Sequence, residues 1–130
     1  MQLIDVYSQD CDRILFDILA ERRPEESISH KDMPSWEDHV KFIHGMPYRH
    51  WYLIYDGGPV GTIYLTAARE VGVFVIAEHR GKGYARAAVR MLLDLHPGKL
   101  LANVNPANYV SKKLWESMGG EMIQVTYSVG

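Results

Sequence analysis

Apolar residues recur along the chain with two different spacings, one typical of helices and one typical of strands. A spacing of three and four residues predicts amphipathic helices over residues 11–19, 36–43, 85–95 and 110–118. Short β-branched or alternating apolar runs predict strands at residues 3–6, 51–55, 60–65, 71–76, 100–104 and 123–129. This order of elements predicts one α/β domain over residues 1–130.

Polar residues and glycines between these runs mark the ends of the predicted elements. Asp56-Gly57-Gly58 predicts a tight turn that joins two strands into a hairpin. Ser8 and Ser35 are predicted to cap the first two helices, because a serine hydroxyl accepts a hydrogen bond from a free N–H group of the first turn. Cys11 falls on the apolar stripe of the first helix, so we interpret it as a small core residue and not as a nucleophile.

Composition narrows the class of protein without identifying it. With 130 residues, 47% of them hydrophobic, the chain can bury a core of its own. The formal net charge of −2 argues against a nucleic-acid partner. The sequence has no apolar run long enough to predict a membrane-spanning helix. A single cysteine excludes an internal disulfide. We therefore expect a cytoplasmic protein, and no cluster of residues suggests a metal site.

The stretch from Glu70 to Pro97 reads as a strand, a glycine turn and a helix in direct succession. The turn, Arg80-Gly81-Lys82-Gly83, lies between the apolar strand and the first helical residues. Glycines allow successive backbone N–H groups to point at one place, where the helix dipole is positive. Such a turn binds anions, most often phosphates. The alternative is a turn that only joins the strand to the helix.

The glycine pattern distinguishes between kinds of phosphate ligand. A dinucleotide fingerprint would need glycine or alanine where Arg86 stands, and the chain has no G-x-x-x-x-G-K-[ST] motif. The pattern R-x-x-G-x-A formed by Arg80, Gly83 and Ala85 instead resembles the coenzyme A pyrophosphate loop of the GNAT family of N-acetyltransferases. The order of predicted elements also resembles that family, which implies a mixed, mostly antiparallel sheet flanked by about four helices.

The resemblance implies a site for acetyl-CoA, the acetyl donor. Main-chain bonds to pantetheine are expected from Val75 and Ala77 at the end of the central strand. The N-x-x-S pattern that starts at Asn108 is similar to the branch containing ribosomal-protein Nα-acetyltransferases and nucleotide-amino-sugar acetyltransferases, and it implies that Asn108 binds the pantetheine arm. The residues expected to hold the pyrophosphate are Arg80, Gly81, Lys82, Gly83, Tyr84 and Ala85.

Acetyl transfer to an amine needs a group that takes a proton from the ammonium and a group that protonates the departing sulfur. Glu70 is the first candidate for the base, with His30 and His50 behind it. Many family members carry a tyrosine in the last helix as the acid, and Trp115 stands at that position here. Ser111, one turn earlier, is therefore the candidate acid.

The function implied is acetyl-CoA-dependent N-acetylation of a primary amine, in an amino sugar, a peptide N-terminus or another small molecule. The amino-acid sequence of residues 28–43 is most similar to that of the amino-sugar enzymes. The chain is short for its branch, so we expect the acceptor site either to be open or to be completed by a second subunit in a homodimer. The alternative is a regulatory module that binds CoA without turnover, which the absent tyrosine would also fit.

Overall fold

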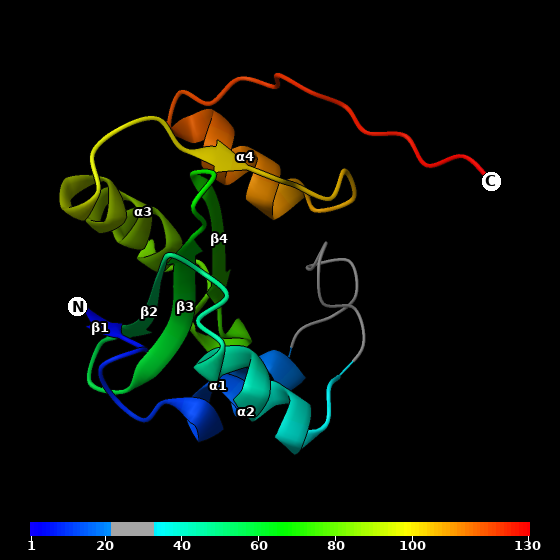
Figure 1. Cartoon of the computed structure of the whole chain (residues 1–130). Coiled ribbons are helices and arrows are strands. Elements are labelled where there is room, and N and C mark those ends of the chain that lie inside the picture. The colour runs from blue at the N-terminus through cyan, green and yellow to red at the C-terminus, as the bar shows by residue number, and fades with distance from the viewer. Residues whose placement is uncertain (22–32) are drawn as a thin grey trace.

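The computed structural model describes residues 1–21 and 33–130. His30, one of the candidate bases, lies outside the described residues. The described residues form five strands and four α-helices of one mixed α/β domain, with the chain order shown in Figure 1. The elements are β1 (Gln2–Asp5), α1 (Asp12–Ala20), α2 (Trp36–His44), β2 (His50–Tyr55), β3 (Pro59–Leu65), β4 (Glu70–Val75), the 3-10 turn η2 (Ala77–His79), α3 (Tyr84–Leu95), β5 (Leu101–Ala102) and α4 (Tyr109–Ser117).

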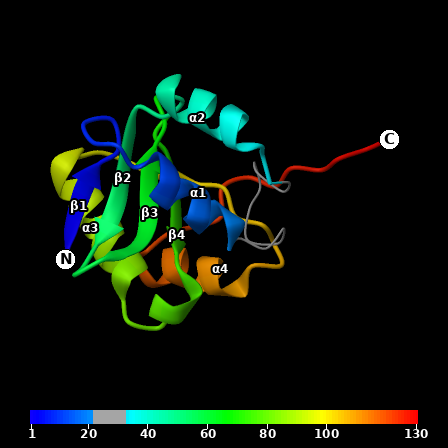
Figure 2. The ribbon, with the colours of Figure 1, turned by 90° about the horizontal axis from the view of Figure 1, so that it is seen from below.

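The strands lie in the sheet in the order β1-β2-β3-β4-β5. The first four are antiparallel neighbours, and β5 pairs with β4 in parallel. Helices α1 and α2 cover one face of the sheet, while α3 and α4 lie on the other (Figure 2). The predicted fold class, a mostly antiparallel mixed sheet with four helices, is confirmed.

Each face of the sheet carries its own part of the core because side chains alternate along a strand. Ile54, Ile63 and Val71 pack against Ala88 and Leu92 of α3 on one face. On the opposite face, α1 and α2 pack against residues that include Trp51, Leu53 and Phe74. In the described part of the chain, no helix is long and apolar enough to cross a membrane.

The close approach of β3 and β4 requires glycine at position 61 of β3. Gly61 pairs with Val75, and a Cβ atom added to Gly61 would lie 2.2 Å from the backbone oxygen of Phe74. This register holds the end of β4 against β3, because the Ile76 N–H also donates to the Val60 carbonyl at 2.9 Å. The chain therefore leaves β4 for the glycine turn from a fixed point.

The predicted helix caps are half correct. Ser35 caps α2, where its Oγ accepts a hydrogen bond from the Asp38 N–H at 3.1 Å. Ser8 does not cap α1, because its hydroxyl donates instead to the Asp5 carbonyl at 3.1 Å and the helix starts later, with Cys11 as its N-cap. The turn after β1 therefore uses the serine that the sequence assigned to the helix.

Cys11 is buried, as predicted for a core residue, and packs with Leu15 and Trp51. Burial first, and then nearby aspartates such as Asp10, raise the pKa of the Cys11 thiol above its ordinary value. A raised pKa lowers the thiolate fraction at neutral pH, so this cysteine is unsuited to nucleophilic chemistry.

Two predicted strands after α3 are wrong in extent or in existence. The strand expected over residues 100–104 shortens to Leu101–Ala102, the only residues that the β4 register reaches. The strand expected over residues 123–129 is absent, and the segment runs away from the domain without a strand partner among the described residues (Figure 1). Its apolar residues are exposed, from 61% for Val125 to 96% for Val129. Alternation of apolar residues is not sufficient to form a strand. A strand also needs a partner for its backbone hydrogen bonds, and the edge strand β5 is only two residues long.

Candidate active site

The glycine turn after β4 leads directly into the N-terminus of α3. Gly81 and Gly83 both adopt left-handed backbone conformations, with φ of 77° and 83°, and Gly83 is the N-cap of the helix. A Cβ atom added at either glycine would meet no heavy atom within 4 Å. The first four N–H groups of a helix have no partner inside the helix. Donors and open space therefore coincide at this turn.

Two side chains hold the turn in place. Arg80 lies with its Cζ atom 5.2 Å from the Phe74 ring centre, and its Nε donates to the Val75 carbonyl at 3.0 Å. Tyr84 donates its hydroxyl to Asp56 Oδ2 at 2.6 Å, which ties α3 to the β2–β3 turn. This bond raises the pKa of Tyr84 and lowers the pKa of Asp56. The turn is thus fixed on both sides before any ligand arrives.

The outer edge of β4 is open beyond its first two residues. β5 pairs with β4 only through Glu70↔Leu101 and Val71↔Ala102. From Gly72 to Val75, no strand of the described chain pairs with that edge. The Val75 carbonyl faces this edge, since it accepts from the Arg80 side chain, and alternation turns the backbone of Val73 the same way. Val73 was missed in the sequence analysis, although the same alternation could have identified it.

Glu70 is the first residue of β4 and pairs with Leu101 of β5, two residues before the open edge begins. Its Oε2 accepts a hydrogen bond from Asn103 Nδ2 at 2.9 Å, which orients the half-buried carboxylate. Alternation places Glu70 on the same sheet face as Phe74, the face covered by α1 and α2. Asn103 was not singled out from the sequence, because nothing in the sequence reveals a contact 33 residues away.

Asn108 and Ser111 meet at the start of α4, beyond β5. Asn108 Oδ1 accepts the Ser111 N–H at 3.1 Å, so the asparagine is the N-cap of the helix. That bond uses the oxygen of Asn108 and leaves the Nδ2 donors for other partners. Trp115, one turn later, packs against the core cluster of β4 and α3. The tryptophan therefore has a packing role at the position where many members of the resembled family carry a tyrosine.

Ala77 lies between β4 and the glycine turn, whereas His50 lies on the other face of the sheet from Glu70. Ala77 lies in the turn η2, and its carbonyl accepts the Arg80 N–H at 3.3 Å. His50 stacks on His96 with ring centres 3.6 Å apart, on the face of the sheet opposite to Glu70. Tyr52 hydrogen-bonds His96 Nε2 at 2.7 Å on the same side. The structure therefore brings Glu70 and Asn103 together and places His50 elsewhere.

The stacked histidines make stability depend on pH. Burial, followed by the neighbouring imidazole and Arg49, lowers the pKa of His50, and burial with Arg69 lowers the pKa of His96. The unfolded chain then binds more protons below about pH 6.5, so stability falls as the pH drops through that value. We expect the free energy of unfolding, measured in urea, to decrease from about pH 7.5 to about pH 5.5. His50→Phe should flatten this dependence, and an unchanged slope would contradict the explanation.

Gly72 of β4 makes room for an aromatic ring on the α1/α2 face. A Cβ atom added to Gly72 would lie 2.2 to 2.5 Å from the outer atoms of the Tyr64 ring. Tyr64 in turn stacks on Tyr48, with ring centres 3.7 Å apart and planes 5° apart. Glycine at position 72 therefore lets Tyr64 lie flat across β4, next to the open edge.

The fold is that of an acetyltransferase. The sequence model of the acetyltransferase (GNAT) family matches residues 13–120, and the chain belongs to this family. The donor that the family uses is acetyl-CoA. Among curated proteins, none matches the sequence significantly.

Solved acetyltransferase structures share the fold. An acetyltransferase from Thermus thermophilus is 21% identical, with a TM-score of 0.73 over 91% of this chain and 84% of that one. A Salmonella typhimurium protein solved with its cofactor acetyl-CoA is 16% identical, with a TM-score of 0.67 over 92% of this chain and 79% of that one. A Vibrio cholerae spermidine N-acetyltransferase chimera is 20% identical, with a TM-score of 0.65 over 82% and 72%.

The residues around the turn fit acetyl-CoA. A side chain at Gly81 or Gly83 would occupy the open space above the turn, and neither position has one. Lys82 is exposed between the two glycines and adds positive charge beside the helix N-terminus. Within the described residues, no group of three or more His, Cys, Asp and Glu could hold a metal ion.

Proposed function

We propose that this protein is an acetyl-CoA-dependent N-acetyltransferase that moves the acetyl group directly to a primary amine. The observation that carries the proposal is the left-handed pair Gly81 and Gly83, open above and placed at the N-terminus of α3. Backbone donors at such a turn suit the pyrophosphate of CoA. The open edge of β4, with the backbones of Val73 and Val75, suits the amide groups of pantetheine.

Acetyl-CoA, when bound, supplies a thioester whose carbonyl carbon forms a bond to the amine nitrogen as its bond to sulfur breaks. The products are the acetylated amine and the CoA thiol, and one proton of the original ammonium is released to solvent. In this proposal Glu70 removes a proton from the ammonium, directly or through water, with its carboxylate oriented by Asn103. Asn108 donates to pantetheine through Nδ2, and Ser111 gives a proton to the departing sulfur.

Calorimetry with CoA and an assay of thiol release together test the proposal. CoA should bind, and at 100 times its dissociation constant it should stabilise the fold by about 2.7 kcal/mol. Thiol release from acetyl-CoA should require a primary amine. If CoA binds but no amine gives thiol release, the chain is a CoA-binding regulatory module instead. If CoA does not bind, both functions are wrong.

Ser111 can be tested separately from CoA binding. Ser111→Ala should lower the rate of the chemical step by about tenfold to 100-fold, the low end of general acid catalysis, because thiols with pKa near 8.5 leave readily. CoA affinity should change little, since the helix cap uses the backbone N–H of Ser111 and not its hydroxyl. Single-turnover kinetics measure the step. A Ser111→Ala enzyme as fast as the parent removes Ser111 from the mechanism.

A further inference from the structure

A cavity of about 220 Å³ lies on the α1/α2 face of the sheet. Its lining is mostly apolar and includes Leu19 of α1, Phe42 of α2, and Tyr48, Trp51 and Tyr64 from the sheet side. Tyr64 is also the ring that lies across Gly72 in β4. One residue of the lining therefore lies over β4, the strand whose open edge is assigned above to pantetheine.

Aromatic rings form one wall of this cavity. Tyr48 stacks on Tyr64 at 3.7 Å, and Trp51 meets Tyr48 edge to face with ring centres 4.9 Å apart. The polar side-chain atoms of Trp51 and Thr62 in this wall already have partners. Trp51 Nε1 donates to Thr62 Oγ1 at 2.8 Å, and that hydroxyl donates to the Tyr52 carbonyl at 3.2 Å. The wall thus presents ring faces and edges to an occupant.

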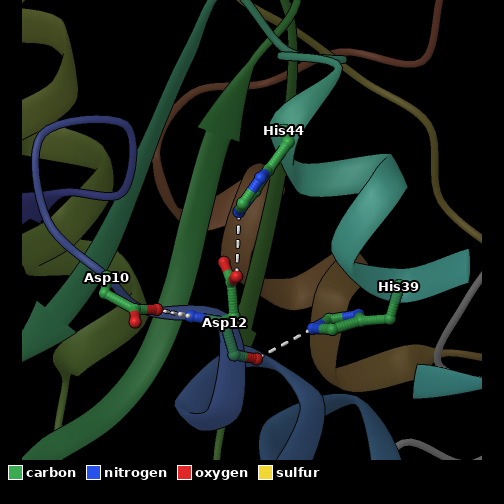
Figure 3. A network of polar contacts seen from close by, with 4 residues as sticks. All are labelled: Asp10, Asp12, His39 and His44. Atoms are coloured by element: carbon green, nitrogen blue, oxygen red, sulfur yellow. Dashed lines mark hydrogen bonds and ion pairs between the residues drawn. The ribbon is translucent and has the colours of Figure 1, made fainter. Parts of the chain in front are cut away.

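Polar contacts join α1 to α2, the two helices that border the cavity. His39, which is buried and borders the cavity, donates from Nε2 to the Asp12 carbonyl at 2.9 Å. His44 Nε2 lies 2.9 Å from Asp12 Oδ2, and the Asp12 N–H donates to Asp10 Oδ1 at 3.2 Å. Figure 3 shows these four side chains converging on the start of α1. Both helical walls are therefore tied together at their polar side.

The size and lining of the cavity discriminate between classes of amine. A cavity of about 150 Å³ with apolar walls holds a benzene ring, so this one accommodates a phenyl ring with a short chain. An amino sugar would leave several hydroxyl groups without partners against these rings. A polyamine needs a carboxylate for each further ammonium group, and among the described residues that line the cavity Asp38 is the one carboxylate.

We infer that the acceptor is a primary arylalkylamine, whose ring lies in this cavity against Tyr48 and Tyr64 while its amine points to β4. This inference rests on the proposed function, since it names the substrate class of the same site. The reaction is the acetyl transfer already balanced above, with an N-acetyl arylalkylamine and the CoA thiol as products.

The test compares 2-phenylethylamine with spermidine, glucosamine and triglycine at saturating acetyl-CoA, with thiol release as the readout. We expect kcat/KM for 2-phenylethylamine to exceed that of the other amines by about 10- to 100-fold, the value of burying one phenyl group. A faster reaction with spermidine, glucosamine or triglycine overturns the arylalkylamine inference and leaves acetyl transfer standing.

A cavity-filling variant locates the effect. Leu19→Trp should lower kcat/KM for 2-phenylethylamine about tenfold or more, because the indole takes the space of the ring. CoA affinity by calorimetry should stay at the parent value, which also shows that the variant folds. Leu19→Met, which conserves volume, and Ala20→Trp, which puts the same indole at an exposed position of α1, should both behave as the parent. Unchanged kinetics in Leu19→Trp would contradict the assignment of the cavity.

If no amine is acetylated, binding of 2-phenylethylamine still tests the assignment of the cavity separately from the enzyme proposal. Calorimetry with 2-phenylethylamine and CoA-bound protein should then still give heat that Leu19→Trp removes, which supports the cavity assignment while the enzyme proposal fails. Absence of binding to the CoA-bound parent protein overturns the inference in that case as well.

Discussion

Replacing Gly83 by aspartate should weaken CoA binding by about 100-fold or more. Two unit charges 4 Å apart interact by about 4 kcal/mol near a protein surface, and a discount for screening leaves roughly 3 kcal/mol of repulsion against the pyrophosphate. The fold should survive, because Gly83 has φ of 83° with open space around an added Cβ, and aspartate tolerates the left-handed region better than most residues. Isothermal calorimetry with CoA measures the loss.

The matched control is Gly83→Asn, which has nearly the same shape and the same backbone tolerance without the charge. We expect asparagine to cost less than about tenfold in affinity, with the difference between the two variants shrinking as salt rises. Equal affinities for the two variants would show that no anion lies against this turn. Undiminished CoA affinity in Gly83→Asp would place the pyrophosphate elsewhere.

Replacing Gly61 by alanine should be the most destabilising small change in the sheet. The added Cβ would lie 2.2 Å from the Phe74 carbonyl oxygen, a backbone atom that cannot rotate away. Strands β3 and β4 would have to separate locally, at a cost of about 3 kcal/mol or more. The melting temperature should fall by roughly 10 °C. Because β4 leads into the glycine turn, CoA affinity should fall as well.

Gly58→Ala, three residues earlier in the same hairpin, provides the control. A Cβ atom at Gly58 meets nothing within 4 Å, and its backbone needs no positive φ. Alanine there should be neutral or stabilise by up to about 1 kcal/mol, since it reduces the freedom of the unfolded chain. If calorimetric melting temperatures of the two variants agree, the tight contact at Gly61 does not determine the register.

Local patterns predicted most of the architecture. The helical stripe over residues 85–95 and the hairpin around Asp56-Gly57-Gly58 both correspond to elements of the structure, because each is set by short-range periodicity or turn chemistry. The glycine turn was located in the same way, since left-handed φ values belong to glycine. The final strand failed because a strand needs a partner, and alternation in Ile123 to Val129 carries no information about one.

The candidate site was only partly visible in the sequence. Glu70 was identified, but Asn103, which orients it, and Tyr64, which lies over Gly72, depend on contacts between distant segments. The similarity of residues 28–43 to amino-sugar enzymes favoured one class of acceptor. The apolar lining of the cavity favours another, because that lining combines α1, α2 and the sheet and has no local sequence signature.

The strand order also determines how the chain can fold. β2, β3 and β4 are joined by short turns, so their pairing closes small loops, whereas β1 reaches β2 only across both helices and β5 reaches β4 only across α3. Contacts of short sequence separation form first because their loop-closure entropy is small. The central meander is therefore the natural nucleus, and each edge of the sheet is added to it with its helices. We therefore expect the two edges, β1 with α1 and α2 and β5 with α3, to exchange their backbone amide hydrogens faster than the central meander.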